Sequence, residues 1–288
     1  MRCKGTNILH TAKIFPQFFS SCSHFAVKCL VFILHTRTFA AVMEAIRGIV
    51  LRTVRYGDDK LIVDLFTEGH GRMSFVTRQT RHRRTMQSAA YWQVLSQVEF
   101  QTELRPTVAL PRPRDVRIYY SYQNLPLSPV KSTIALFLAE FLSAALREEK
   151  QNTALYHYIE HSLQWFDEAR FPMAIANFHL VFMMRMSRFI GFYPNIDDYR
   201  PGDFFDLRMA SFTTTPPTHP DFLNPVDAAH ISTLMRMNYE TMHLFRMSRH
   251  DRNRIVEVLT LYYRLHVSAF PELQSLAVMK ELWADEKP

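Results

Sequence analysis

The spacing of apolar residues changes near residue 126, and this change constrains the fold more than any other feature of the chain. In the run from Trp92 to Gln101, apolar and polar side chains largely alternate, which is the period of a β-strand. From Ile134 to Leu146, apolar residues recur every three or four positions, which is the period of an amphipathic helix. The pattern therefore predicts a β-rich N-terminal part followed by a helical C-terminal part.

Short strands and tight turns fill the first part of the chain. Four of the seven glycines fall there, two of them in the turn Glu68-Gly-His-Gly71. Five short strands predict a small closed barrel such as an OB-fold, and an SH3-like barrel would give much the same pattern. We therefore expect an α+β protein, with an N-terminal OB-fold β-barrel at 43–125 followed by an all-helical C-terminal domain at 126–288. The expected strands lie near residues 46–55, 61–66, 72–78, 92–101 and 116–120.

Helical periodicity dominates the second part of the chain, with one interruption. The third expected helix is apolar nearly all round, which predicts that it is central and buried. Residues 192–225 hold six of the fifteen prolines, so we expect an irregular insertion there, with a small hairpin at Phe204–Thr213. The expected helices lie near residues 134–146, 153–169, 174–190, 226–245, 248–267 and 276–283.

Residues 1–42 differ in composition from the rest of the chain. They hold five Lys/Arg, no Asp/Glu and all three cysteines. We expect either a disordered extension or a mis-assigned start, with Met43 as the working start; a secretory signal around Phe25–Leu34 is the alternative. The absence of cysteine from 43–288 excludes a disulfide framework, a cysteine nucleophile and a thiolate zinc site in the body, and fits a reducing cytosol.

The net charge is divided unevenly between the two expected domains. Residues 43–125 carry thirteen Lys/Arg and eight Asp/Glu, whereas residues 126–288 carry sixteen and nineteen. A basic module joined to a faintly acidic one indicates a polyanionic partner for the first. A solvated basic surface without a partner would give the same composition.

A cluster of basic residues near the end of the third expected strand is the first candidate site. Arginine binds phosphate through a planar fork of donors, and contact with DNA phosphates releases counterions. Exposed aromatic side chains for base stacking are also needed to bind single strands, and Tyr56, Tyr91 and His82 are candidates. The expected DNA-contacting residues are Arg47, Arg52, Arg55, Arg72, Arg78, Arg81, His82, Arg83 and Arg84, and Lys60 could extend the patch.

Other clusters carry weaker signals. A second basic patch (Arg246, Arg249, Arg252 and Arg254) could contact DNA or an acidic protein, but a salt-bridged helix end would look the same. His157 and His161 have the i, i+4 spacing of metal ligands, yet no third ligand is identifiable, so we expect no metal and no cofactor. Acidic residues and a histidine in 195–221 could be assembled into an acid–base site, but they are scattered through a proline-rich loop, and we expect no enzymatic activity.

Several strings resemble one family. Gly48-Ile-Val-Leu-Arg52, Tyr56-Gly-Asp, Ile62-Val-Asp-Leu-Phe-Thr67 and Gly71-Arg72, followed by arginines, resemble the N-terminal domain of the RecO family of bacterial recombination mediators. Phe178-His-Leu and Arg188-Phe-Ile-Gly-Phe-Tyr-Pro194 resemble its central helix and the exit from it. The resemblance covers about residues 44–284. It implies an OB-fold followed by a helical domain, in agreement with the periodicity.

The resemblance also implies a function. Proteins similar to RecO bind single- and double-stranded DNA and anneal complementary strands. They also bind RecR and the single-stranded-DNA-binding protein, and they help RecA to load. That implies a cytoplasmic, nucleoid-associated protein with no membrane partner. The alternative is a protein-interaction scaffold whose basic barrel binds an acidic protein segment.

One departure from the family concerns zinc. Many members carry four cysteines after the central helix, whereas this chain reads Asn195-Ile-Asp-Asp-Tyr199 there. The segment 192–225 must then be held by ordinary packing or be mobile.

Overall fold

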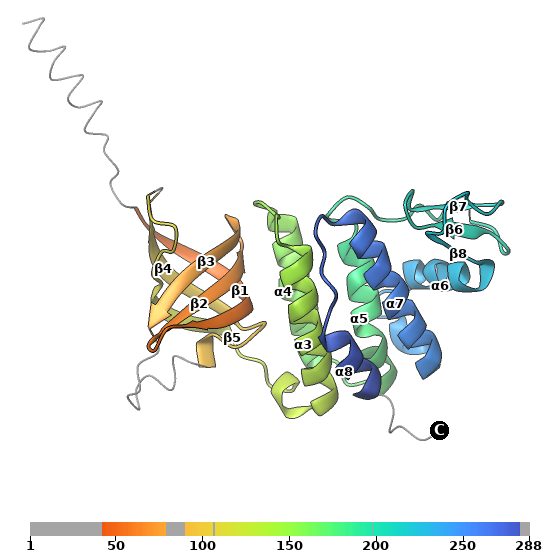
Figure 1. Ribbon diagram of the computed structural model, residues 1–288. Coiled ribbons are helices and arrows are strands. Elements are labelled where there is room, and N and C mark those ends of the chain that lie inside the picture. Colours follow the sequence, from red (N-terminus) through yellow and green to blue (C-terminus); the bar gives the residue numbers. More distant parts are fainter. Residues whose placement is uncertain (1–41, 79–89, 106, 198, 283–288) are drawn as a thin grey trace, which may run out of the picture.

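The structure is a computed structural model that describes residues 42–78, 90–105, 107–197 and 199–282. A five-stranded sheet lies at one end of the molecule and a three-stranded sheet at the other, with the helices between them (Figure 1). All strands of the large sheet precede the long helices in the chain. This order confirms the predicted α+β class.

The large sheet is antiparallel, with the strand order β3-β2-β1-β4-β5. Its strands are β1 (Val42–Tyr56), β2 (Lys60–Thr67), β3 (Gly71–Arg78), β4 (Gln97–Leu104) and β5 (Arg114–Tyr120). β1 pairs with β4 through its first half and with β2 mainly through its second half, and a register shift between Val50 and Arg52 bends it. The Val76 N–H donates to the Pro111 carbonyl at 3.0 Å and ties β3 to the connection before β5. The result is the predicted OB-like sheet, with no β3–β5 ladder in the described chain.

Eight helical segments follow the large sheet in the described part of the chain. They are η2 (Leu125–Leu127), α3 (Pro129–Ala145), α4 (Thr153–Glu168), α5 (Pro172–Met186), α6 (Pro225–Arg236), η3 (Met242–Leu244), α7 (Arg249–His266) and α8 (Ser275–Leu282). As predicted, α5 is buried nearly all round. The prediction of a single helix over 226–245 was wrong, because α6 ends at Arg236. Asn238 then accepts the Thr241 N–H at 2.7 Å and forms a turn before η3.

The fourth strand also departs from the prediction. β4 begins at Gln97 and not at Trp92, although Trp92 is buried in the sheet's own core as expected. Val94, expected to face inward, is 36% exposed. Gln97, expected to face solvent, is fully buried because α4 covers that face of the sheet. The Gln164 amide of α4 donates to Gln97 Oε1 at 2.9 Å.

The segment 192–225 contains the predicted hairpin and one further strand. β6 (Phe204–Asp206), β7 (Ser211–Thr213) and β8 (Phe222–Leu223) form the small sheet, in the order β7-β6-β8. Aromatic packing holds it, since Phe205 contacts Phe212 within it and Tyr262 of α7. In the described residues, ordinary packing therefore replaces the cysteines that many RecO-like proteins carry here.

The connection between the large sheet and the helices is fixed by hydrogen bonds. The buried Asp167 carboxylate accepts the N–H groups of residues 123–125 at 2.6–2.9 Å. Lys131 donates to the carbonyls of Asp167 and Ala169 at 2.7 and 2.8 Å, and so satisfies the C-terminal end of α4. The residues between β5 and α3 thus form an anchored joint.

Two apolar cores lie in the part of the chain that the structure describes. The first, the barrel core, lies inside the large sheet and includes Val63, Phe75 and Phe100. The second, the shared core, runs through the helices and also takes in side chains of the large sheet, among them Ile49 and Phe66. The sheet and the helices are therefore packed together over an apolar contact.

Candidate nucleic-acid interface

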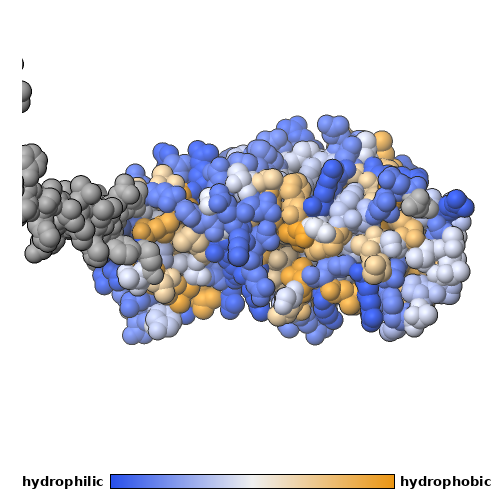
Figure 2. Space-filling model, turned by 90° about the horizontal axis from the view of Figure 1, so that it is seen from above, coloured by the Kyte–Doolittle hydropathy of each residue, from blue (hydrophilic) through white to orange (hydrophobic). Residues whose placement is uncertain are grey.

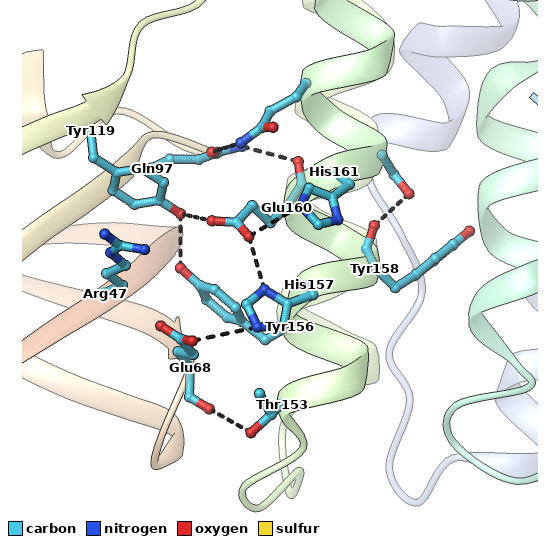
Figure 3. A network of polar contacts seen from close by, with 12 residues as sticks. Arg47, Glu68, Gln97, Tyr119, Thr153, Tyr156, His157, Tyr158, Glu160 and His161 are labelled. Carbon is cyan, nitrogen blue, oxygen red and sulfur yellow. Dashed lines mark hydrogen bonds and ion pairs between the residues drawn. The ribbon is translucent and has the colours of Figure 1, made fainter.

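A polar network joins the large sheet to α4 (Figure 3). The Tyr119 hydroxyl donates to Glu160 Oε1 at 2.6 Å and lies 2.9 Å from the Tyr156 hydroxyl. His157 Nδ1 lies 3.0 Å from the second Glu160 oxygen, and its Nε2 lies 3.4 Å from Glu68 on the β2–β3 turn. Burial raises the pKa of Tyr119 far above its usual value, so this hydroxyl stays protonated as a donor. The network fixes the sheet against α4.

The structure places Arg47 within this junction. Its Nε donates to Glu99 at 3.1 Å, its guanidinium lies 5.3 Å from the Tyr119 ring centroid, and the same Glu99 binds Arg117 at 2.6 Å. The bond to Glu99 raises the pKa of the Arg47 guanidinium. Arg47 is therefore already paired, and only half of its side chain is exposed.

Arg72 also has partners at the junction. Its guanidinium donates to the Ser143 carbonyl of α3 at 2.6 Å and to Asp64 at 3.0 Å. The backbone of the neighbouring Gly71 packs closely against the helical part. Its φ is +69°, and a Cβ there would come within 2.4 Å of the Lys150 backbone. We therefore assign Arg72 a role in holding the two parts together, and contact of Arg72 with DNA stays a prediction.

Replacing Arg72 with alanine is expected to lower the free energy of unfolding by about 2 kcal/mol, since it removes two charge-assisted bonds at a partly buried site. Arg78→Ala is the matched control, because the Arg78 side chain is 67% exposed and its one ion pair among the described residues is with Asp59, at 3.8 Å. That control should change stability by less than about 0.5 kcal/mol. Urea unfolding followed by circular dichroism measures both. Equal losses in the two variants would contradict the assignment.

Two of the predicted arginines, Arg55 and Arg78, lie beside the β1–β2 turn, and Arg52 lies further along β1, opposite Asp64. Arg52, Arg55 and Arg78 are exposed. Strand register places Tyr56 opposite Lys60, and Lys60 opposite Arg78, so these three side chains form one row across β1, β2 and β3. Tyr56, a predicted stacking residue, is 60% exposed. The predicted residues Arg81, His82, Arg83 and Arg84 lie outside the described residues.

Sequence reasoning missed Arg112. It is exposed, and its neighbours are Pro111 and Pro113, which restrict its backbone. The Thr102 hydroxyl donates to its carbonyl at 3.1 Å. The signal was present in the Pro-Arg-Pro sequence, but the pairing of Pro111 with Val76 of β3 could not be seen before the fold was known.

The second basic patch is only partly a surface. Arg252 is 6% exposed and donates to the Met247 carbonyl at 2.7 Å, and Arg254 pairs with Asp227 at 2.7 Å. Ser248 and Asp251 form a capping box at the start of α7. Arg246 and Arg249 remain exposed. The alternative interpretation, a salt-bridged helix end, describes Arg254 well.

Of the residues considered for an acid–base site, His219 and Asp221 have structural contacts, and Asp198 lies outside the described residues. Asp206 accepts the N–H groups of residues 208 and 209 and lies 3.2 Å from His219, while Asp221 pairs with Arg208. These contacts brace the small sheet. No group of three or more His, Cys, Asp or Glu side chains that could hold a metal ion occurs within the described ranges. In the same ranges, no helix is long and apolar enough to cross a membrane.

The large sheet carries the row of Tyr56, Lys60 and Arg78 and is joined through a packed junction to helices. This arrangement defines a protein of the OB-plus-helical class. Comparison with protein families agrees with this class. The family model described as recombination protein O N terminal matches residues 43–122, and the one described as recombination protein O C terminal matches residues 126–276. The chain belongs to the RecO family.

Individual relatives carry the same family name. The DNA repair protein RecO of Phocaeicola vulgatus is 49% identical over 237 residues, which cover 82% of this chain and 98% of the relative. The DNA repair protein RecO of Bacteroides fragilis is 45% identical, with 82% and 97% covered. That of Azobacteroides pseudotrichonymphae is 34% identical over 239 residues, with 82% and 98% covered. The similarity therefore extends over nearly the whole length of each relative.

Proposed function

We propose that this protein is a DNA-binding recombination mediator in DNA repair. In this role it binds single- and double-stranded DNA, anneals complementary strands, and helps RecA to load onto DNA coated by the single-stranded-DNA-binding protein, with RecR as a further partner. It acts in the cytoplasm at the nucleoid, by binding and without covalent catalysis. The observation that carries the proposal is the row of Tyr56, Lys60 and Arg78 across an OB-like sheet in a chain of the RecO family.

The electrostatics support binding to a polyanion. Residues 43–125 carry five more basic than acidic residues, while the helical part, 126–288, is faintly acidic. Figure 2 shows a largely hydrophilic surface interrupted by separate apolar patches. Binding through phosphates releases counterions, so affinity must fall as the salt concentration rises. Three phosphate contacts alone give a slope of log K against log salt of about −2 for single strands.

The test is binding of the full chain to a fluorescent single-stranded oligonucleotide between 50 and 200 mM salt. We expect tight binding at low salt with a slope of about −2 or steeper. Arg81→Ala combined with Arg83→Ala should weaken binding while the thermal unfolding curve stays unchanged. A folded protein that binds no DNA at low salt would overturn the proposal. Capture of an acidic protein segment in its place would favour the scaffold alternative.

A further inference from the structure

A hollow at the end of the large sheet brings together cations from three separate segments. It has a volume of about 140 Å³, and Lys60 of β2, Arg78 of β3 and Arg112 of the β4–β5 connection line it, with Val76, Thr77 and Pro113 between them. Strand pairing places Lys60 beside Arg78. The bond from Val76 to Pro111 brings Arg112 to the same place.

The charges of this hollow are largely uncompensated. The Asp59 carboxylate lies 3.8 Å from the Arg78 guanidinium. Both side chains are more than half exposed, so this ion pair is weak. No carboxylate among the described residues pairs with Lys60 or Arg112. The junction arginines differ in this respect, since Arg47 and Arg72 each have a carboxylate partner within about 3 Å.

The backbone that carries Arg112 is fixed before any ligand arrives. Prolines on both sides limit its conformations, and hydrogen bonds hold the carbonyls of Pro111 and Arg112. A fixed backbone removes one part of the entropy that this arginine would lose on binding an anion. Its planar fork of donors matches two oxygens of one phosphate group.

The row beside the hollow supplies an aromatic surface. Tyr56 lies directly across from Lys60 and is exposed. The next row of the same face, Val54, Ile62 and Val76, is apolar and partly exposed. A phosphate site beside an exposed ring and an apolar strip fits a strand whose bases are unpaired, because a base in duplex DNA cannot stack on a protein side chain.

We infer that the hollow lined by Lys60, Arg78 and Arg112 binds a backbone phosphate of single-stranded DNA, while an adjacent base stacks on Tyr56. The inference rests on the proposed DNA-binding function and adds the position of the strand and a preference for single strands. Arg112 and Lys60 supply charge, and Tyr56 distinguishes single strands from duplex.

The test measures the affinity of full-length variants for a fluorescent oligo(dT) strand and for a duplex of equal length. Arg112→Gln and Lys60→Gln should each lower single-strand affinity about tenfold at 50 mM salt, and each should reduce the salt slope by about 0.7. Arg236→Gln is the matched control, because Arg236 is also an exposed arginine but lies at the end of α6. It should change neither quantity.

Tyr56 is tested separately. Tyr56→Ala should weaken single-strand binding about tenfold and leave duplex binding unchanged, whereas Tyr56→Phe should keep the wild-type affinity because it keeps the ring. Phe171→Ala removes an equally exposed ring from the helical part and should have no effect. If the wild type binds DNA but Arg112→Gln and Lys60→Gln bind it as Arg236→Gln does, the inference is overturned and the proposed function is not. Absence of DNA binding by the wild type would overturn the proposed function.

Discussion

Replacing Phe66 with alanine is expected to lower the free energy of unfolding by about 3–5 kcal/mol, and to loosen the large sheet and α4 together. Phe66 is fully buried and belongs to the shared core, where its ring centroid lies 6.1 Å from that of Tyr156 on α4. Truncation to alanine leaves a cavity that neither the sheet nor the helix can fill alone. The loss should therefore appear on both sides of the junction.

Phe75 provides a matched comparison. It is also a fully buried phenylalanine of the same sheet, but it packs in the barrel core, with its ring centroid 4.9 Å from that of Phe100. Phe75→Ala should lower the free energy of unfolding by a similar amount, about 3–5 kcal/mol. The local loosening should lie mainly in the large sheet. The two variants thus remove the same side chain from two different cores.

Hydrogen exchange read by mass spectrometry separates the two cases. In Phe66→Ala, peptides of β2 and of α4 should both exchange faster, because local opening follows the contacts that are lost. In Phe75→Ala, the increase should be larger in β2 and β3 than in α4. Unchanged exchange of α4 in Phe66→Ala would contradict a shared core and would mean that the two parts unfold independently.

Periodicity predicted what depends on local pattern, and it failed where a second part of the molecule intervenes. The strands β1, β2, β3 and β5 and the buried helix α5 follow directly from the spacing of apolar residues. The face of β4 does not, because Gln97 is polar but buried against α4. A polar residue on a strand predicts a side chain exposed to solvent. Only the position of the partner helix shows that Gln97 is paired with Gln164.

The candidate site shows the same limit. All basic residues look alike in a sequence, so Arg47, Arg72 and Arg78 were grouped together. The structure separates them by their partners, since Arg72 binds Asp64 and the Ser143 carbonyl, whereas Arg78 is mostly exposed. Arg112 joins Arg78 only because the chain before β5 bonds to β3, a contact between residues 35 positions apart, Val76 and Pro111. Such contacts are not encoded in local spacing.

Acid is expected to destabilise the helical domain through a single histidine. His179 of α5 is 1% exposed, lies edge-on to the Phe137 ring, and has a buried Nδ1 without a hydrogen-bond partner among the described residues. Burial, and secondarily the Arg252 guanidinium, lowers the pKa of His179 to about 3. The imidazole is thus neutral in the folded protein at every pH above that value.

The sign of the effect follows from proton binding. In the unfolded chain the pKa of a histidine is about 6.5, so below that pH the unfolded state binds a proton that the folded state excludes. The contribution to stability is therefore complete above pH 6.5 and is lost progressively as the pH falls toward 3. The loss amounts to about 2 kcal/mol between pH 6.5 and 5, and to about 4 kcal/mol by pH 3.

Urea unfolding of wild type and His179→Gln across pH 5–8 measures how much His179 contributes to the pH dependence of the free energy of unfolding. The variant should be less stable at pH 8, because a core side chain has been changed, but it should lose about 2 kcal/mol less between pH 6.5 and 5. His250→Gln is the matched control, since His250 is 93% exposed and should leave the wild-type pH dependence unchanged. If His179→Gln and wild type lose stability in parallel over this interval, the proton is excluded by some other buried group, and the acid sensitivity of the helical core does not depend on His179.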